Sequence, residues 1–280
     1  MSKLNQQTKI VIAAAKTFID PDLAPLLDNA LTAHYESNEP LPAGLKTAVL
    51  DRIERAKQKD SDKITVRPKR LSSHHIANGI ASKILYEANQ TPLRAGEPTC
   101  VTLIELSADS VLKVEPISAL QRDYLVVRGD VNFGDQVLTQ RDYRIVPAGL
   151  NDVDCASENG ALLLVRESNQ TPLPSDAITV VYDDQAGWPE YAPGIARRVL
   201  WARNGQAAML YLTQANASVP DHSHHHDEEC FMVAGELYLD DTLLLEGDYQ
   251  LAKASSGHVV THTDTGVVLY AHGDLDLAFK

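Results

Sequence analysis

The feature that most constrains how this chain folds is a long internal repeat. Residues 123–149 (DYLVVRGDVNFGDQVLTQRDYRIVPAG) match residues 229–255 without a gap, at the offset of 106 positions that separates Gly129 from Gly235. The other pairs at this offset are Asp135 with Asp241, Asp142 with Asp248, Tyr143 with Tyr249 and Gly160 with Gly266. A repeat of this length is too long for one unit of a solenoid, so it indicates a duplicated small domain.

Both copies lie in a part of the chain that has the pattern of an all-β fold. From about residue 76 onward, short runs rich in Val, Leu, Ile and Tyr alternate with Gly, Asp, Asn and Pro, which is typical of sandwiches and barrels. GIASKILY at residues 79–86 matches GIARRVLW at residues 194–201 at the larger offset of 115, so the first copy carries a longer loop.

The N-terminal part of the chain has a helical pattern instead. Apolar residues recur on one face in three runs, and proline-containing stretches separate these runs. The charged, weakly hydrophobic segment that follows is interpreted as a linker. The predicted fold is mainly β, with a small helical region at residues 1–60, a linker at 61–75, and two barrels at 76–170 and 171–280.

Composition excludes several classes of function. The chain has 280 residues and a formal net charge of −13, and so acidic a chain does not suit broad binding of nucleic acid. Its three cysteines are far apart, form no disulfide framework and indicate a reducing compartment. The apolar run IVIAAA near the N-terminus is too short to span a bilayer, and no signal-peptide layout surrounds it. We therefore expect a cytoplasmic protein that contacts neither nucleic acid nor a membrane directly.

A histidine-rich run, VPDHSHHHDEEC at residues 219–230, lies inside the chain, so it is not an expression tag. The spacing there is His222, His224, Glu228 and Gly235, followed by Gly247, Asp248, Tyr249 and then His258. This spacing resembles the two motifs of the cupins, which lie on strands of a small antiparallel barrel. The resemblance implies a double-stranded β-helix, duplicated as a bicupin over roughly residues 76–278.

The spacing is also physically suited to a metal site. Alternate residues of a strand face the same side, so His222, His224 and Glu228 can converge inside a barrel, while His258 has to come from a neighbouring strand. Three imidazoles and one carboxylate suit zinc, iron, manganese or nickel, and leave positions open to water or substrate. The predicted ligands of one divalent metal ion, with zinc as the expected ion, are His222, His224, Glu228 and His258.

Neighbouring histidines leave alternatives open. His226 shares the parity of His224, so these two form an alternative pair, although the register of the repeat favours His222 with His224. His225 points the other way and is expected at the surface. His262 is a candidate partner for a metal ligand or a surface residue.

The first copy provides an internal control. Subtracting the offset of 106 from each predicted ligand gives Pro116, Ser118, Arg122 and Asp152, a set that would not hold a transition metal. We therefore predict that the first barrel is structural or binds a different ligand. Our hypothesis is that Arg122 and Asp152 form a buried ion pair at the position of the metal.

The second copy resembles one group of cupins more closely, the ChrR-like anti-sigma factors. It has their H-x-H-x3-E spacing, a GD strand and a late histidine, and the stretch from Trp188 to Gly194 is similar to the start of their cupin domain. That family joins an N-terminal helical anti-sigma domain to a zinc-binding cupin. The resemblance implies that residues 1–60 hold a sigma factor of the ECF type. However, residues 1–75 contain no cysteine, whereas the family's helical domain binds zinc through a Cys-x-x-Cys pair.

Three functions are consistent with these observations. The resemblance implies a transcription-regulatory or sensing protein, whose metal site responds to a small molecule or oxidant and could place an oxidisable Cys230 nearby. The alternative is a metal-dependent cupin dioxygenase or isomerase, with Glu229, Cys230, Tyr249 and His262 as candidates for proton transfer. The third is a ligand-binding or structural bicupin without turnover. Because bicupins often pair further, we also expect a homodimer.

Overall fold

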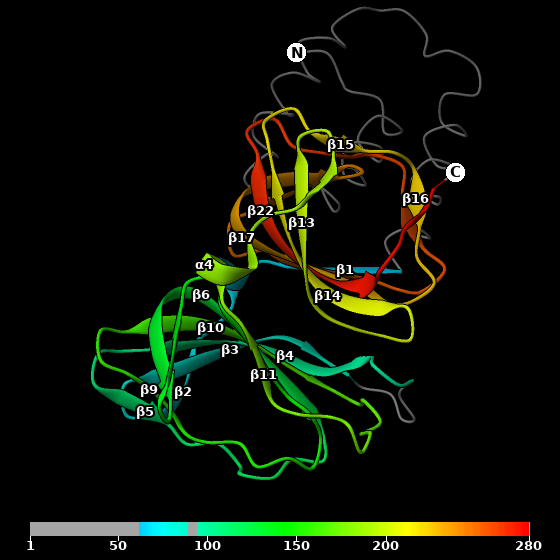
Figure 1. Ribbon diagram of the computed structural model, residues 1–280. Helices are drawn as coiled ribbons and strands as arrows, with labels where there is room; N and C mark the ends of the chain where they lie inside the picture. Colours follow the sequence, from blue (N-terminus) through cyan, green and yellow to red (C-terminus); the bar gives the residue numbers. More distant parts are fainter. Residues whose placement is uncertain (1–61, 89–93, 280) are drawn as a thin grey trace, which may run out of the picture. The chain divides into compact units, whose positions relative to one another are not determined.

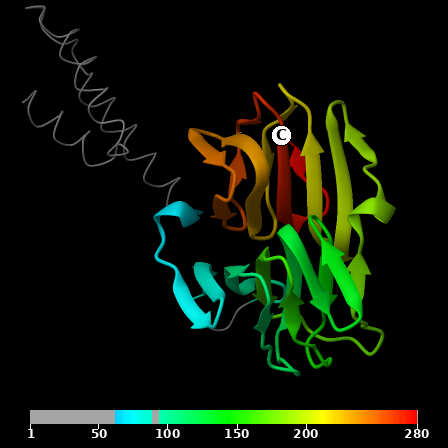
Figure 2. The same ribbon diagram turned by 90° about the vertical axis from the view of Figure 1, so that its left-hand side faces the viewer.

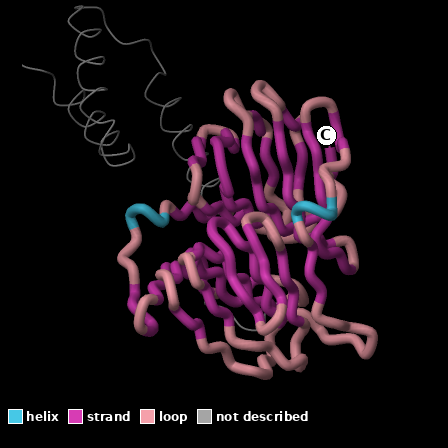
Figure 3. Tube along the Cα trace, turned by 60° about the vertical axis from the view of Figure 1, so that its left-hand side comes forward, coloured by secondary structure: helices cyan, strands magenta, loops and turns pink. Residues whose placement is uncertain are grey.

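The computed structural model describes residues 62–88 and 94–279, all within one compact unit of the chain. The helical region predicted for residues 1–60 lies outside these described residues. Strands dominate the described part (Figure 3), as the sequence predicts. The helical segments among the described residues are the single turns η1 (Pro68–Arg70) and α4 (Asp183–Ala186). No helix in this part of the chain is long and apolar enough to cross a membrane.

The first copy of the repeat contains strands β2 to β10. They are β2 (His74–Ala77), β3 (Ile80–Glu87), β4 (Pro98–Leu106), β5 (Ser110–Leu112), β6 (Gln121–Phe133), β7 (Gln136–Thr139), β8 (Tyr143–Val146), β9 (Cys155–Ser157) and β10 (Ala161–Ser168). Together with β11 (Thr179–Val181) they form a sheet with the order β11-β8-β6-β10-β4-β3-β2, to which β5, β7 and β9 attach. This copy is coloured cyan to green in Figure 1.

The second copy contains strands β12 to β23, coloured green to red in Figure 1. They are β12 (Glu190–Ala192), β13 (Ile195–Arg203), β14 (Gln206–Thr213), β15 (Ser218–Val219), β16 (His222–Ser223), β17 (Glu228–Leu239), β18 (Thr242–Leu245), β19 (Tyr249–Ala252), β20 (Gly257–His258), β21 (Thr261–His262), β22 (Val267–Asp274) and β23 (Ala278–Phe279). Six of them join β1 (Lys63–Val66) in a sheet of equivalent order, β1-β19-β17-β22-β14-β13-β12, to which β15, β18 and β21 attach. Strands β20-β16-β23 form a small third sheet.

The repeat is visible in the strand register as well as in the sequence. Gly129 of β6 pairs with Ala161, and Gly235 of β17 pairs with Val267, so both partners are displaced by the same 106 positions. A Cβ atom on either glycine would lie 2.2 Å from the carbonyl oxygen of Gly160 or Gly266, and both backbones have positive φ. Only glycine fits such a close approach, which explains why both copies have glycine at these positions.

The two copies exchange their first strands. Strand β1, which precedes the first copy in the sequence, pairs with β19 of the second sheet, and β11, which precedes the second copy, pairs with β8 of the first sheet. Figure 1 shows β1 in blue among the yellow and red strands. The segment 61–75, interpreted above as a linker, thus contains an edge strand of the second sheet. Alternate residues anchor it, because Thr65 accepts a hydrogen bond from Gln250 (2.9 Å) and Arg67 donates to Asp248 (2.7 Å).

The central strands β6 and β17 are buried on both faces. One face of β17 carries Cys230 and Met232 into the interior of the second copy, and the other carries Phe231 and Val233 into an apolar cluster that both copies share. Such strands are continuous apolar runs rather than alternating ones. The shared cluster contains Leu125, Tyr143 and Leu164 of the first copy and Leu200, Phe231 and Tyr249 of the second, with ten further buried residues. These contacts hold the two sheets together.

Charged side chains are also buried between the two copies. Arg166 Nε donates to Glu229 Oε1 (2.7 Å), and Arg166 Nη1 lies 3.7 Å from Asp123 Oδ2. Asp123 and Glu229 occupy equivalent positions in the repeat. Their two carboxylates share the guanidinium of Arg166. Burial raises the pKa of Asp123 to about 6, because Arg166 only partly offsets the loss of hydration.

Candidate metal centre

The four predicted ligands come together in the interior of the second copy. His222 on β16 lies opposite His258 on β20 in an antiparallel pair, and Glu228 is the first residue of β17. His224 follows β16, and its backbone exchanges hydrogen bonds with the loop before β20, through Ser255 and Ser256. The alternation of side chains along an extended chain turns His222 and His224 to the same side, as the spacing predicts.

The donor atoms of three of these residues lie close enough to share one ion. One ligand atom from each of His222, His224 and Glu228 lies within 4.8 Å of the other two. Glu228 Oε2 lies 3.2 Å from His224 Nε2 and 3.5 Å from His258 Nε2. The His258 ring centroid is 5.3 Å from that of His224 and 5.7 Å from that of His222.

Burial leaves several of these nitrogens without partners. The three imidazoles are between 1% and 3% exposed. Both ring nitrogens of His224, and Nε2 of His258, make no regular hydrogen bond among the described residues, although Glu228 Oε2 lies close to both rings. A buried polar atom without a partner costs about 1–3 kcal/mol. A metal ion would satisfy these nitrogens, so the donor set fits a divalent cation.

The protonation states also suit metal binding. Burial lowers the pKa of His224, and the attraction of Glu228 only partly opposes this, so the imidazole is neutral at pH 7. Burial alone would raise the pKa of Glu228, but the neighbouring imidazoles of His224, His258 and His222 lower it to about 2. Neutral imidazoles and an ionised carboxylate are the forms that ligate metals.

Hydrogen bonds from outside the cluster orient two of the rings. His222 Nδ1 lies 2.8 Å from the carbonyl oxygen of Pro220, which fixes the proton on Nδ1 and leaves Nε2 as a lone pair. His258 Nδ1 lies 3.3 Å from Asp240 Oδ2 and 3.1 Å from Lys63 Nζ. Burial alone would raise the pKa of Asp240, but the hydrogen bonds from Lys63 and from the backbone of Val259 and Val260 together lower it well below its ordinary value.

The other histidines of the run lie elsewhere. His225 is exposed, as expected, and His226 Nδ1 lies 2.5 Å from Asp274 Oδ1. Asp274 also accepts hydrogen bonds from the backbone N–H groups of both residues, so it fixes the loop between His224 and Glu228. The alternative pair of His224 and His226 is therefore not assembled.

The remaining candidates for proton transfer are also placed away from the cluster, apart from Cys230. His262 stacks on Tyr238 and its Nε2 lies 3.2 Å from Asp264. Glu229 of β17 and Tyr249 of the neighbouring β19 face the first copy, on the opposite side of the sheet from Glu228. Cys230 shares the face of Glu228, but burial raises the pKa of its thiol well above the ordinary value. Its thiolate is therefore disfavoured, which fits a packing role.

The equivalent position in the first copy holds an ion cluster instead. Arg122 Nη1 lies 3.6 Å from Asp152 Oδ2 and both side chains are buried, which supports the hypothesis of a buried pair. Arg144 makes a shorter contact, 2.7 Å from Nη1 to Asp152 Oδ1, and Tyr124 donates to Oδ2 of the same carboxylate (2.7 Å). The sequence reasoning missed Arg144. The same offset would have found it, since Arg144 stands where the second copy has Gln250.

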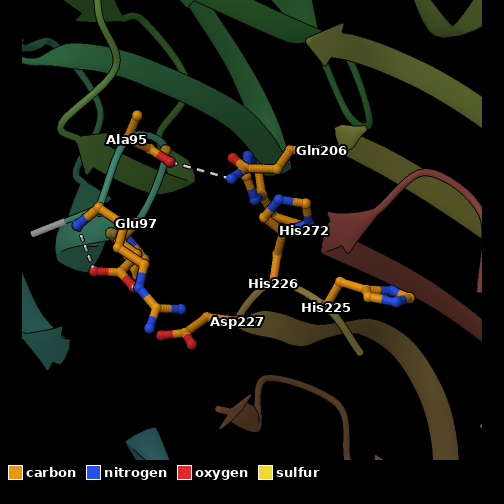
Figure 4. A pocket seen from close by; sticks show the side chains of 10 residues that line it. Ala95, Glu97, Gln206, His225, His226, Asp227 and His272 are labelled. Carbon is orange, nitrogen blue, oxygen red and sulfur yellow. Dashed lines mark hydrogen bonds and ion pairs between the residues drawn. The ribbon is translucent and has the colours of Figure 1, made fainter. Parts of the chain in front are cut away.

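A separate pocket of about 240 Å³ opens beside the histidine run (Figure 4). Its lining includes Glu97 and Gln206, together with His226 and His272. Gln206 Nε2 donates to the carbonyl oxygen of Ala95 (3.1 Å), which joins the two copies across the pocket. None of the four predicted ligands lines it, so the pocket is distinct from the cluster inside the barrel.

Comparison with known proteins gives a family-model match in the second copy. Residues 176–276 match the family model of the ChrR cupin-like domain. We found no match among curated proteins. The matched segment includes all four predicted ligands.

Solved structures extend the likeness in fold beyond this domain. A cupin 2 conserved barrel domain protein from Leptotrichia buccalis is 14% identical, with a TM-score of 0.52 over 75% of this chain and 96% of that chain. The bacterial pirin from Escherichia coli in complex with nickel(II) is 11% identical, with a TM-score of 0.58 over 75% and 98%. A mutant of oxalate decarboxylase from Bacillus subtilis is 14% identical, with a TM-score of 0.57 over 75% and 77%. At these identities the likeness shows the cupin fold, and it covers more of the chain than the matched domain.

Proposed function

We propose that this protein binds one divalent metal ion, zinc, through His222, His224, Glu228 and His258. The observation that carries the proposal is the set of buried ring nitrogens without partners, gathered around one carboxylate. Without an ion, this interior would bury polar atoms at a cost of several kcal/mol. The bound ion would supply a positive charge that satisfies these donors.

We further propose that the protein is a regulator of the ChrR-like type, which senses a small molecule or oxidant at the second copy. Two observations support a sensing rather than a catalytic site. The matched family model is that of the ChrR cupin-like domain. The cluster is also closed, because the imidazoles are buried and β23 pairs with β16, which brings the Phe279 ring edge-on to His222 (6.4 Å). Zinc held by four protein ligands is typical of structural sites, whereas catalytic sites keep one position open.

In this proposal the partner is a sigma factor of the ECF type, held by residues 1–60. Co-expression of the full chain with the ECF sigma factors of the same genome, followed by co-purification, tests it. We expect one of them to be retained by the full chain and lost when residues 1–60 are removed. Retention of none would leave a metal-binding protein without this regulatory role.

An enzyme, a metal-dependent dioxygenase or isomerase, is the second candidate. The observation that favours it is the number of donors, because four ligands leave positions unfilled on iron or manganese, which prefer six. A substrate would then have to reach the cluster beside Glu228, whose side chain is 12% exposed.

The metal content of the purified full chain tests the proposal and separates the two candidates. Elemental analysis would compare the wild type with His224→Ala and with His225→Ala, a matched control in the same loop whose side chain is 74% exposed. We expect about one equivalent of zinc in the wild type and the control, and none in His224→Ala. Iron or manganese at this stoichiometry would favour the enzyme, and no metal in any of the three would refute the site.

A further inference from the structure

A lysine from outside the second copy reaches the candidate metal centre. Lys63 lies on β1, which joins the second sheet by strand exchange (Figures 1 and 2). Its Nζ lies 2.5 Å from Asp240 Oδ2 and 3.1 Å from His258 Nδ1, and His258 Nδ1 lies 3.3 Å from the same carboxylate oxygen. Lys63, Asp240 and His258 thus form a triad behind one predicted ligand.

The two partners of His258 demand opposite positions of its proton. An ammonium group has only donors, so Lys63 can bond to Nδ1 only when Nδ1 is a lone pair and the proton is on Nε2. Asp240 can only accept, so it bonds to Nδ1 when the proton is there. A metal needs a lone pair on Nε2, which selects the second arrangement.

We propose that metal binding switches His258 from accepting a hydrogen bond from Lys63 to donating one to Asp240, so that β1 reports whether the site is occupied. This inference rests on the proposed metal site. The switch moves one proton between the nitrogens of a neutral imidazole and changes no net charge. Lys63 opposes metal binding and Asp240 supports it, although the two form one ion pair.

Comparison with the first copy indicates that the triad of Lys63, Asp240 and His258 occurs together with the histidine cluster. By the two offsets, Lys63 corresponds to Ile178, Asp240 to Gly134 and His258 to Asp152. The copy without the histidine cluster therefore lacks all three members, and Ile178 packs against its apolar core. An ion pair that served only to attach the exchanged strand would be needed equally in both copies.

Asp240 contacts both the loop after His258 and Lys63, so it can couple the proton position of His258 to β1. Its Oδ1 accepts hydrogen bonds from the backbone N–H groups of Val259 (2.8 Å) and Val260 (3.2 Å), so it also holds the loop after His258. When His258 donates to Oδ2, Lys63 keeps only Asp240 as a partner. The other anchors of β1, at Thr65 and Arg67, do not touch the cluster. The change is therefore confined to the start of β1, the strand that follows residues 1–62 directly in the chain.

Zinc affinity of two variants tests the proposal, because the switch predicts effects of opposite sign. Lys63→Met removes the competing donor, so we expect zinc to bind about tenfold more tightly. Asp240→Asn keeps an oxygen for the backbone N–H groups but presents N–H donors to His258, so we expect binding about 10- to 100-fold weaker, as for other outer-shell partners of metal ligands. Lys113→Met is the matched control, since Lys113 pairs with Asp154 at 2.5 Å on the surface of the first copy.

Competition with a chromophoric zinc chelator would give the affinities of the full-length variants, with folding checked by circular dichroism. A purely structural ion pair would weaken binding in both variants or in neither, and either result would overturn the switch. Lys63→Arg, which retains the charge, should stay close to the wild type. If the wild type itself bound no zinc, the proposed function would fail, whereas zinc binding without opposite shifts would reject the switch alone. Hydrogen exchange of the backbone amide at position 63 adds a second readout. Zinc should speed this exchange in the wild type and not in Lys63→Met.

Discussion

Replacing Asp123 with asparagine should change how the stability of the protein depends on pH. Asp123 is 1% exposed and shares Arg166 with Glu229. Gln121 donates to its Oδ1 (3.1 Å), and Tyr143 also lies beside it. Burial raises its pKa from 3.8 to about 6 in the folded protein. One pKa unit corresponds to about 1.4 kcal/mol, so this rise corresponds to about 3 kcal/mol.

The direction follows from the raised value. A carboxyl whose pKa is higher in the folded chain binds its proton more tightly there, so protonation stabilises the fold. The contribution of protonated Asp123 to the free energy of unfolding is complete below about pH 4 and is lost as the pH rises through 6. Asp123→Asn cannot ionise, so it should be more stable relative to the wild type at pH 7 than at pH 4, by about 3 kcal/mol.

Urea unfolding of both proteins at several pH values between 4 and 8, in the presence of a metal chelator, measures this difference. Asp154→Asn is the contrasting control, because hydrogen bonds from Lys113 and from the backbone of Val114 lower the pKa of Asp154 below 3.8, so its difference from the wild type should stay nearly constant between pH 4 and 8. A difference between Asp123→Asn and wild type that does not change with pH would refute the argument. The titration would then belong to another member of the buried cluster.

Three further predictions concern the fold and the metal. Gly235→Ala should lower the free energy of unfolding by about 2 kcal/mol or more, because a Cβ atom would lie 2.2 Å from the oxygen of Gly266. Gly247→Ala has a similar positive φ but open space around it, so it should lower this free energy by only about 1 kcal/mol. Urea unfolding measures both. Arg166→Met should cost about 3–5 kcal/mol at pH 7, because it leaves two buried carboxylates without their cation, and a loss below 1 kcal/mol would contradict this. Zinc at about 100 times its dissociation constant should stabilise the wild type by about 2.7 kcal/mol in thermal unfolding, and should leave His224→Ala unchanged.

Much of the fold could be predicted because the repeat transfers information between its copies. The offset of 106 places Gly129 and Gly235 at equivalent positions of the two sheets. In the structure they pair with the equivalent residues Ala161 and Val267. The alternation of His222 and His224 is a local property of extended chain, so it predicts their common face. His258 needed the resemblance to cupin motifs, because its position depends on how β20 pairs with β16.

The strand exchange could not be predicted in the same way. Strand β1 is only four residues long, its sequence KITV is bounded by charges, and its partner lies almost two hundred residues away. Nothing local distinguishes such a strand from a linker, since its stability comes from pairing with β19 and from long-range contacts such as that of Lys63 with Asp240. The same holds for Asp274, whose role depends on β22 passing beside the histidine run.

The central claim is that one metal ion lies among the three imidazoles and Glu228, and anomalous diffraction from crystals of the full-length protein tests it most directly. Data collected on either side of the zinc absorption edge would locate the ion without reference to any assumed ligand. We predict a single zinc peak within bonding distance of His222, His224, Glu228 and His258. A peak at His225 and His226, or no peak in the second copy of zinc-loaded protein, would contradict the account.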